Sequence, residues 1–312
     1  MRFMTSLKFI DVVAREKSIR KAAEKLAITS TALNRRILQI EEEIGQPLFE
    51  RLPSGVRLNT AGEIFVQHIR AQFAELSRVQ SQIADLSGIR RGHVKIASSA
   101  DALRQFLPES IASYRAEHPA VSFNLARCYG EEAEARLFSL DADIALIFAP
   151  IQAAHVHVAA TLRQNIHAVM PAESPLADRK TIRLRDLNDQ RVLLPTAASG
   201  IRQMMDSALL RRSAEMDVIL ESDSFEFMQN FLRHEHAMFF QIPIALGPID
   251  ENGLITGIDN RELVARPLDL ADVPAGTLHL CHLKGRVLPV AAAKFLDGVI
   301  TELRGRFDEV DQ

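Results

Sequence analysis

The sequence predicts a chain in two parts: a mainly helical N-terminal module that ends in a long helix, and an α/β body of two doubly wound lobes. Three observations lead to this fold class. A helix-turn-helix pattern spans residues 18–51, an apolar stripe runs along residues 61–88, and short apolar strands alternate with helices from residue 92 onwards. With 312 residues, the chain is long enough for each part to bury its own core.

The first helix is expected at residues 7–14, and we interpret its role as structural. Two short helices joined by a tight turn follow it. The first of them carries the pair Ala22-Ala23 on its apolar face, and these small residues let another helix approach closely. The second should be capped by Thr29 or Ser30 and end at Gly45. Its predicted buried face consists of Ala32, Leu33, Ile37, Ile40 and Ile44.

Positive charge is concentrated in this N-terminal segment. Residues 1–60 hold eleven lysines and arginines against seven acidic residues, a net charge of +4, whereas the whole chain carries −3, which leaves −7 for the remainder. Such asymmetry indicates a polyanion-binding module on an acidic body, although the charge alone also fits a solvated helix face. Spacing, turn and charge together favour a helix-turn-helix whose second helix enters a DNA major groove.

The segment KSIRKAAEKLAITSTALNRRILQIEEEIGQPLFER resembles the winged helix-turn-helix of LysR-type transcriptional regulators. The resemblance rests on the Ala-Ala pair, the turn, Leu33 and the runs 40–45 and 47–51, and it continues more weakly to the C-terminus. It departs from the family where bases are read, at Ser30 and Asn34, so no operator sequence can be carried over. The resemblance implies a cytoplasmic regulator that binds double-stranded DNA as a homodimer or homotetramer and responds to a small-molecule effector.

Residues 50–58 predict a β-hairpin, with Pro and Gly in its loop. In the resembled family this hairpin is the wing, which lies along the minor groove. Arg57 is its stronger candidate for a DNA contact, whereas Arg51 has the alternative of pairing with the acidic run 41–43. Bases should be read by residues 30, 31, 34 and 35. The predicted DNA-binding residues are Ser18, Lys21, Lys25, Thr29, Ser30, Thr31, Asn34, Arg35, Arg36, Arg51 and Arg57.

A long helix should start at a cap on Asn59 or Thr60, with Thr60 and Glu63 forming a capping box, and end at Gly88. About 28 residues span roughly 42 Å, which is longer than a compact domain needs. We infer a dimer in which two copies of this helix pair along their apolar stripe, the alternative being a helix packed on the chain's own body. The stripe consists of Ile69, Leu76 and Ile83 at sevenfold spacing, with Phe65, Phe73, Val79 and Leu86 between them.

After a basic hinge at residues 89–92, strands and helices alternate as in a doubly wound parallel sheet. Two such lobes joined by crossing strands make a periplasmic-binding-protein-like body. The first set has strands at 93–97, 121–125 and 144–148 and helices at 103–118 and 131–140; the chain leaves it through a looser stretch after Pro150. The predicted domains are 1–60, 61–88 and 89–312, with lobe I at 92–160 and 268–312 and lobe II at 161–267.

The effector should bind between the lobes, where strand C-termini meet helix N-termini. In the resembled family this cleft binds a small molecule, often an anionic metabolite or an aromatic acid. The alternative for each serine and threonine is helix capping. Asp101 argues against a dianion, and Arg202 supplies either a counter-charge or a surface ion pair. The predicted effector-binding residues are Ser98, Ser99, Ala100, Asp101, Phe148, Thr196, Ser199, Gly200, Ile201, Arg202 and Gln241.

Features that would indicate catalysis, a metal or a redox pair do not meet their requirements. His234 and His236 face different sides of a helix, and no third ligand accompanies His279 and Cys281. Cys128 and Cys281 lack a resolving cysteine nearby, which favours a reducing compartment. Neither a membrane-spanning run nor a signal-peptide layout is expected. We therefore expect no enzyme, no cofactor and no metal. The alternative is an α/β ligand-binding protein or enzyme with an N-terminal association module.

Overall fold

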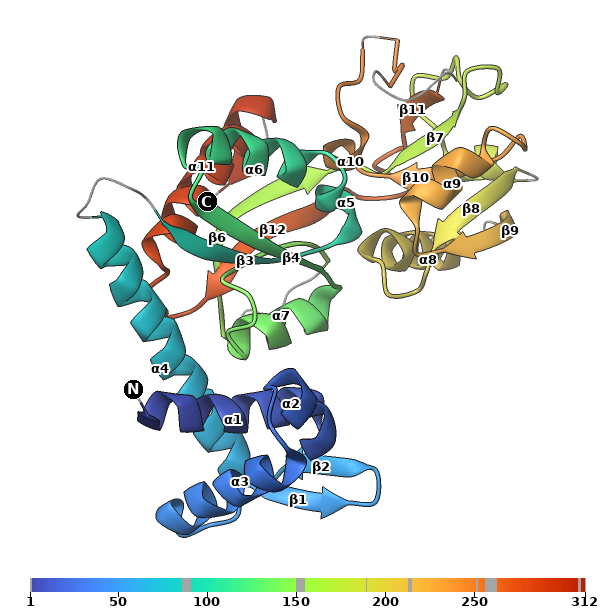
Figure 1. The fold of residues 1–312 in the computed structure, drawn as a ribbon. Coiled ribbons are helices and arrows are strands. Elements are labelled where there is room, and N and C mark those ends of the chain that lie inside the picture. The colour runs from blue at the N-terminus through green and yellow to red at the C-terminus, as the bar shows by residue number, and fades with distance from the viewer. Residues whose placement is uncertain are drawn as a thin grey trace. The chain divides into compact units, whose positions relative to one another are not determined.

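A computed structural model describes residues 2–85, 91–149, 155–188, 190–212, 215–250, 252–255, 263–307 and 310–311. It divides the chain into two compact units, Met1–Gln80 and Ser81–Gln312. Among the described helices, none combines the length and the apolarity that crossing a bilayer would require. The first unit is helical apart from one hairpin, and the second is an α/β structure with two sheets (Figure 1).

The N-terminal unit has the predicted helix-turn-helix followed by the predicted hairpin (Figure 1). Its elements are α1 (Arg2–Glu16), α2 (Ile19–Lys25), α3 (Ser30–Ile44), β1 (Phe49–Leu52), β2 (Gly55–Leu58) and the start of α4 (Thr60–Asp85). Thr29 caps α3 by accepting a hydrogen bond from the backbone N–H of Ala32, and Gly45 ends the helix with φ 78°. Both predictions are therefore confirmed, but Ile44 is 38% exposed rather than buried, because it lies in the last turn, beyond the core.

Helix α4 differs from the prediction in two ways. Asn59 caps it by accepting a hydrogen bond from the Gly62 N–H, so the capping box at Thr60 is wrong. Ile69 is fully buried in the core of the N-terminal unit, whereas Leu76 and Ile83 are exposed. The sevenfold stripe therefore has two roles, since its first part packs on α1–α3. The predicted end at residues 86–88 and the hinge residues 89–90 lie outside the described residues.

The described strands of the first lobe form a six-stranded mixed sheet in the order β13-β6-β12-β5-β3-β4. The strands are β3 (Gly92–Ser98), β4 (Val121–Arg127), β5 (Ile144–Phe148), β6 (Val156–Gln164), β12 (Gly276–Leu283) and β13 (Val310–Asp311). The helices are α6 (Phe106–Glu117) and α11 (Val290–Arg306) on one face and α7 (Gly130–Phe138) on the other (Figure 1). Along β5, Ile144 and Leu146 join the core under α6 and α11, while Ala145 and Ile147 join the one under α7, because strand side chains alternate.

Two elements of this lobe depart from the sequence prediction. The helix expected at 103–118 is broken into α5 (Ala100–Leu103) and α6. Pro108 explains the break, since proline lacks an N–H and is tolerated only in the first turn of a helix, where α6 places it. The stretch expected to be loose after Pro150, itself outside the described residues, contains the nine-residue strand β6.

The described strands of the second lobe form a five-stranded sheet in the order β11-β7-β10-β8-β9. The strands are β7 (His167–Pro171), β8 (Arg191–Pro195), β9 (Asp217–Ser222), β10 (Met238–Gln241) and β11 (Leu263–Pro267). The helical segments are η1 (Leu184–Leu187), α8 (Gly200–Arg212), α9 (Phe225–Phe231) and α10 (Pro243–Leu246). Met205 of α8 joins one buried cluster and Met228 of α9 another, so the two helices cover opposite faces.

Within the described residues, the chain crosses from one sheet to the other twice. Strand β6 belongs to the first sheet up to Gln164, and β7 opens the second at His167. The return runs from Pro267, the last residue of β11, to Gly276, the first of β12. The first passage thus lies a few residues beyond the position 160 expected from the sequence. Together the two passages bring the ends of β5, α8 and β12 close to one another.

Candidate nucleic-acid interface and inter-lobe cleft

The outer face of α3 carries the residues that were expected to read bases. Ser30, Thr31 and Arg35 are exposed, while Leu33 and Ile37 on the opposite face are buried in the core. The separation follows from the helical period, since one face is anchored and the other is free. The N-terminal half of α3 therefore presents hydroxyls and a cation to the outside.

Leu38 shares this outer face and was not among the predicted residues. Its side chain is 48% exposed, although leucine normally lies in a core. Its position three residues after Arg35 and four after Asn34 places it on their side of the helix. An exposed apolar group there can contact the methyl group of a thymine. The helical spacing alone contained this signal.

The cations of the unit differ in whether they are already paired. Lys25 forms an ion pair of 2.7 Å with Glu16, and Arg36 donates a hydrogen bond to the Gln39 amide oxygen. Among the described residues, neither Lys21 nor Arg35 has a side-chain hydrogen bond or an ion pair. The Lys25 bond lowers the pKa of the Glu16 carboxyl. Lys21 and Arg35 are thus available to an anion without first breaking a contact.

The wing is tied to the recognition helix. Arg51 donates a hydrogen bond of 2.9 Å to the Asn34 side-chain oxygen, so its partner is not the acidic run. The carboxylate of Glu41, in that run, instead accepts hydrogen bonds from the backbone N–H groups of Leu48 and Phe49. These bonds fix the start of β1. Arg57 pairs with Glu50 at 2.6 Å on the surface, where ion pairs contribute little and exchange easily.

Ser18 and Thr29 serve as helix caps in the structure. Each hydroxyl oxygen accepts a backbone N–H of the following helix, from Lys21 and Ala32 respectively. A hydroxyl that accepts a bond keeps its own hydrogen for donation. The cap predicted at Thr29 is therefore present, Ser18 caps the preceding helix in the same way, and each O–H stays free to meet a phosphate.

In the α/β unit, seven of the predicted effector residues line one cavity between the lobes. It has a volume of about 30 Å³, which suffices for one or two water molecules. Tyr129, Phe225 and Asp223 also line it. An ion pair of 2.8 Å between Arg127 and Asp223 joins the lobes at its edge. The predicted residues in its lining are Ser99, Ala100, Asp101, Ser199, Gly200, Ile201 and Gln241.

Asp101 dominates the chemistry of this small cavity. Burial raises the pKa of its carboxyl group. Hydrogen bonds with the side chains of Ser99 and Gln241 act in the opposite direction and lower it. Gln241 lies on β10, so this hydrogen bond links the two lobes. A buried carboxyl disfavours an anionic ligand at this position.

The remaining predicted residues do not line this cavity. Arg202 forms ion pairs of 2.9 Å with both Asp206 and Glu221, so the ion-pair alternative for it is the one the structure contains. Ser98 is fully buried and donates its hydroxyl to the Ser99 carbonyl. Thr196 accepts the Ser199 N–H at its carbonyl in the turn before α8. Arg202 and Ser98 thus bond to neighbouring protein groups through their side chains, and Thr196 does so through its backbone carbonyl.

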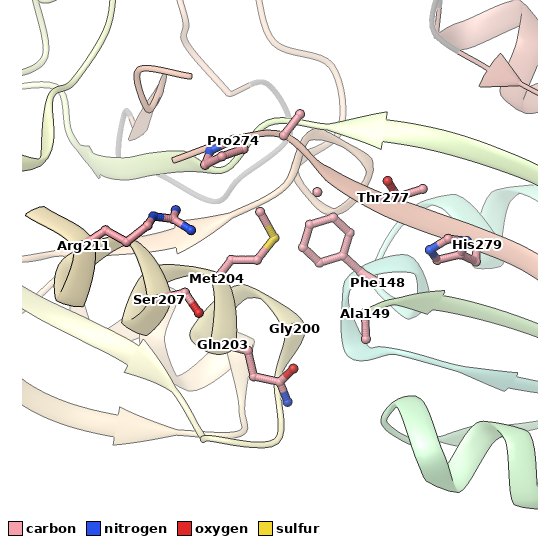
Figure 2. Close-up of a pocket in the computed structure, with 12 residues that line it drawn as sticks. Phe148, Ala149, Gly200, Gln203, Met204, Ser207, Arg211, Pro274, Thr277 and His279 are labelled. Atoms are coloured by element: carbon pink, nitrogen blue, oxygen red, sulfur yellow. The ribbon is translucent and has the colours of Figure 1, made fainter. Parts of the chain in front are cut away.

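A larger cavity of about 520 Å³ lies beside the first, where α8 meets the ends of β5 and β12 (Figure 2). Gly200 separates the two: a Cβ at this position would lie 1.9 Å from the Phe148 carbonyl oxygen, so only glycine lets α8 approach β5. Of the predicted residues, only Phe148 and Gly200 line it. Its lining consists of Phe148, Ala149, Gly200, Gln203, Met204, Ser207, Arg211, Pro274, Ala275, Gly276, Thr277 and His279.

Comparison with known families identifies both units. The family model "LysR substrate binding domain" matches residues 87–304, and "Bacterial regulatory helix-turn-helix protein, lysR family" matches residues 4–63. The chain belongs to the LysR family of transcriptional regulators. As a LysR-type protein it is a DNA-binding regulator whose activity is modulated by a small molecule bound in the two-lobed domain.

Known regulators resemble this LysR-type chain over between three fifths and nearly all of its length. A RuBisCO operon transcriptional regulator of Allochromatium vinosum is 26% identical over 300 residues, 96% of each chain. The transcriptional dual regulator GltC of Bacillus subtilis is 30% identical over 194 residues, 62% of this chain and 65% of GltC. A full-length OxyR variant of Pseudomonas aeruginosa, 20% identical, shares the fold with a TM-score of 0.66 over 95% of this chain and 94% of OxyR. Full-length CbnR in complex with its target DNA is 15% identical and has a TM-score of 0.61, over 95% of this chain and 98% of CbnR.

Proposed function

We propose that this LysR-type regulator reads its operator with Ser30, Thr31, Asn34 and Arg35. The observation that carries the proposal is the outer face of α3, where hydroxyls, an unpaired cation and an exposed leucine lie together. Hydroxyl and guanidinium groups supply the donors that base edges accept in a major groove. Lys21, Lys25, Arg36, Arg51 and Arg57, together with the caps Ser18 and Thr29, would hold the phosphates.

We propose that the regulator is a homodimer or homotetramer joined through the C-terminal half of α4. Leu76, Val79 and Ile83 support this, since they are exposed and recur at helical spacing on one face of the helix. Two copies of the helix would present two α3 helices at a fixed separation. The proposed segments are residues 1–60 for DNA, 61–88 for pairing and 89–312 for the effector.

We propose that the effector acts by changing how closely the lobes approach each other. A ligand that binds one arrangement better shifts the population towards it, and the arrangement of the paired DNA-binding units follows. The lobe I segments 92–160 and 268–312 and the lobe II segment 161–267 would move as bodies. Such a protein works in the cytoplasm, where the chromosome is, and performs no catalysis.

The proposal is tested by the salt dependence of DNA binding. Bound fragments are mapped genome-wide, and one is titrated with full-length protein by fluorescence anisotropy. If two subunits together neutralise about six phosphates, the affinity falls about a thousandfold between 50 and 200 mM salt. A random duplex of the same length is the control. A flat salt response, or equal affinity for both duplexes, would support the alternative that the N-terminal unit serves only protein association.

A further inference from the structure

The wing hairpin is anchored to the helices through both of its strands. The Glu41 carboxylate binds the N–H groups at the start of β1, and in β2 the Val56 N–H donates a hydrogen bond of 3.0 Å to the Lys17 carbonyl oxygen. A Cβ at Gly55 would lie 2.3 Å from the same carbonyl oxygen, so the hairpin packs directly against the turn between α1 and α2. All four residues of β1 pair with β2. The hairpin therefore holds its side chains at fixed places.

Arg51 connects this anchored hairpin to the recognition helix. It is the third residue of β1, opposite Val56 in β2. Its guanidinium donates a hydrogen bond of 2.9 Å to the Oδ1 atom of Asn34 in α3. A guanidinium has five N–H donors, so one of them can hold Asn34 while others remain for a phosphate. A phosphate bound there would keep the guanidinium against the helix.

The hydrogen bond decides which end of the Asn34 amide stays free. Arginine has no acceptor, so the atom that it meets must be the amide oxygen. The amide nitrogen has no hydrogen-bond partner among the described residues. On α3, Asn34 lies one turn after Ser30 and one turn before Leu38, which are both exposed. Asn34 therefore offers a donor to its surroundings while its oxygen is turned towards the wing.

The base edges of the major groove distinguish such an amide from an unrestrained one. An unrestrained asparagine pairs with adenine by donating an N–H to N7 and accepting the N6–H at its oxygen, so both ends of the amide must meet the base. Guanine instead offers two acceptors, N7 and O6. An amide whose oxygen points to the wing can donate to guanine but does not accept from adenine.

From this geometry we infer that Arg51 sets part of the base preference of this regulator: by orienting Asn34, it makes that residue read guanine where an unrestrained asparagine would read adenine. Arg51 is thus a positioning residue in addition to its proposed phosphate contact. The inference rests on the proposed function, since it takes Asn34 as one of the residues that face base edges, and it adds which base Asn34 selects.

The test is selection of bound duplexes from a randomised library by the full-length protein, followed by anisotropy titration of duplexes that differ at one base pair. Asn34→Ala identifies that base pair, because the preference for a base should disappear at that position alone. For the unaltered protein we expect guanine there to bind about tenfold more tightly than adenine, the size of one good base contact. Arg51→Met keeps an unbranched side chain but has no donor, so it should reverse the order and favour adenine.

Arg57→Met is the matched control. Arg57 lies on the other strand of the same hairpin and is likewise exposed, but it pairs with Glu50 instead of a residue of α3. Its loss should weaken all duplexes alike, as the loss of one phosphate contact does, and should keep the preference for guanine. Circular dichroism and the thermal midpoint without DNA show that each variant is folded.

The inference is overturned if the unaltered protein prefers any base other than guanine at that position, or if Arg51→Met keeps the guanine preference. It is also overturned if Arg57→Met changes the preference as Arg51→Met does, or if Asn34→Ala alters no position. Arg35→Ala is selected on the same library. A sequence preference that depends on Arg35 but not on Asn34 would leave the proposed function intact and reject the inference alone, whereas the absence of any enriched sequence would reject the proposed function.

Discussion

Arg35 and Lys21 are chemically similar but hold different positions on the helix-turn-helix. Arg35 lies on the outer face of α3 with Thr31 and Leu38, whereas Lys21 lies on α2, near the Ser18 cap. In the proposed complex the first position would face the base edges of a groove and the second its phosphate border. The two residues should therefore contribute to different components of DNA affinity.

We predict that Arg35→Ala weakens binding to the operator about 10- to 100-fold and binding to random DNA far less, because a lost base contact costs about 1–3 kcal/mol. Anisotropy titrations on both duplexes measure this. Lys21→Ala is the control, since losing one phosphate contact should weaken both duplexes alike and reduce the salt slope by about one. Equal losses for Arg35→Ala on both duplexes would show that Arg35 contacts only phosphate.

Asp272 determines part of the response of the α/β unit to acid. Its carboxylate accepts hydrogen bonds from Arg183 and from the Leu184 N–H, and these with its ion pair to Arg212 lower its pKa to about 2. The pKa of Asp272 in the folded chain thus lies below the ordinary value of about 3.9. The stability that its contacts contribute is therefore complete above about pH 4 and is lost as the pH falls towards 2.

We predict that Asp272→Asn lowers the free energy of unfolding by about 1–2 kcal/mol at pH 7, and that the gap from the unaltered protein narrows below pH 4. Urea denaturation at pH 7 and pH 3 measures both values. Asp178→Asn, an exposed carboxylate without a partner among the described residues, should change little at either pH. A gap of the same size at pH 3 would contradict the assignment.

At the scale of elements, helix α4 does two different tasks along its length. Around Ile69 it completes the core of the N-terminal unit, supported by an ion pair of 2.6 Å between Arg70 and the buried Asp11 of α1. Beyond Phe73 its apolar residues face outwards, with Leu76 43% and Ile83 61% exposed. An apolar stripe on a helix predicts burial, but it does not say whether the same chain or another copy provides it.

We predict that Leu76→Asp with Ile83→Asp yields monomers in sedimentation velocity and leaves the helical content unchanged, because the two charges would lie in the paired surface. Ser77→Asp, at an exposed position of α4 outside the apolar stripe, is the control and should keep the oligomer. Ile69→Asp cannot test assembly, since a charge there would unfold the N-terminal unit itself. Oligomers that persist in the double variant would refute pairing through α4.

At the scale of the whole α/β unit, Gly200 marks a place where the two lobes approach each other closely. Helix α8 of one lobe starts against the carbonyl of Phe148 at the end of β5 in the other. Asp101 with Gln241 and Arg127 with Asp223 add polar links between the lobes. The approach at Gly200 separates the water-sized cavity from the larger one, so it sets the shape of both.

We predict that Gly200→Ala lowers the free energy of unfolding of the α/β unit by about 1–3 kcal/mol, the usual cost of overpacking, because the added methyl group would collide with backbone. Gly298→Ala in α11 is the control: its Cβ would meet nothing within 4 Å, so stability should hold or rise by up to about 1 kcal/mol. Chemical denaturation compares the two. Equal stability of both variants would show that the lobes separate without cost.

Features that depend on near neighbours could be predicted from the sequence. The cap at Thr29, the stop at Gly45 and the turn between β1 and β2 each follow from a few adjacent residues. Strand β6 was missed because polar residues such as His157 and Arg163 interrupt its apolar pattern, although pairing with β12 buries much of it. The residues of the water-sized cavity were found because strand ends and helix starts carry a local signature.

The helix-turn-helix, the wing and the division into a basic module and an acidic α/β body could be predicted from the sequence alone. Only the tertiary structure shows which part of α4 stays uncovered, that Arg202 is paired, and that the roomier cavity lies beside Met204 rather than at Asp101. The physical reason is the separation along the chain of the residues that interact. Caps, turns and periodic faces depend on residues a few positions apart, whereas a cavity or a free charge depends on how closely distant backbones approach, as Gly200 and Phe148 do.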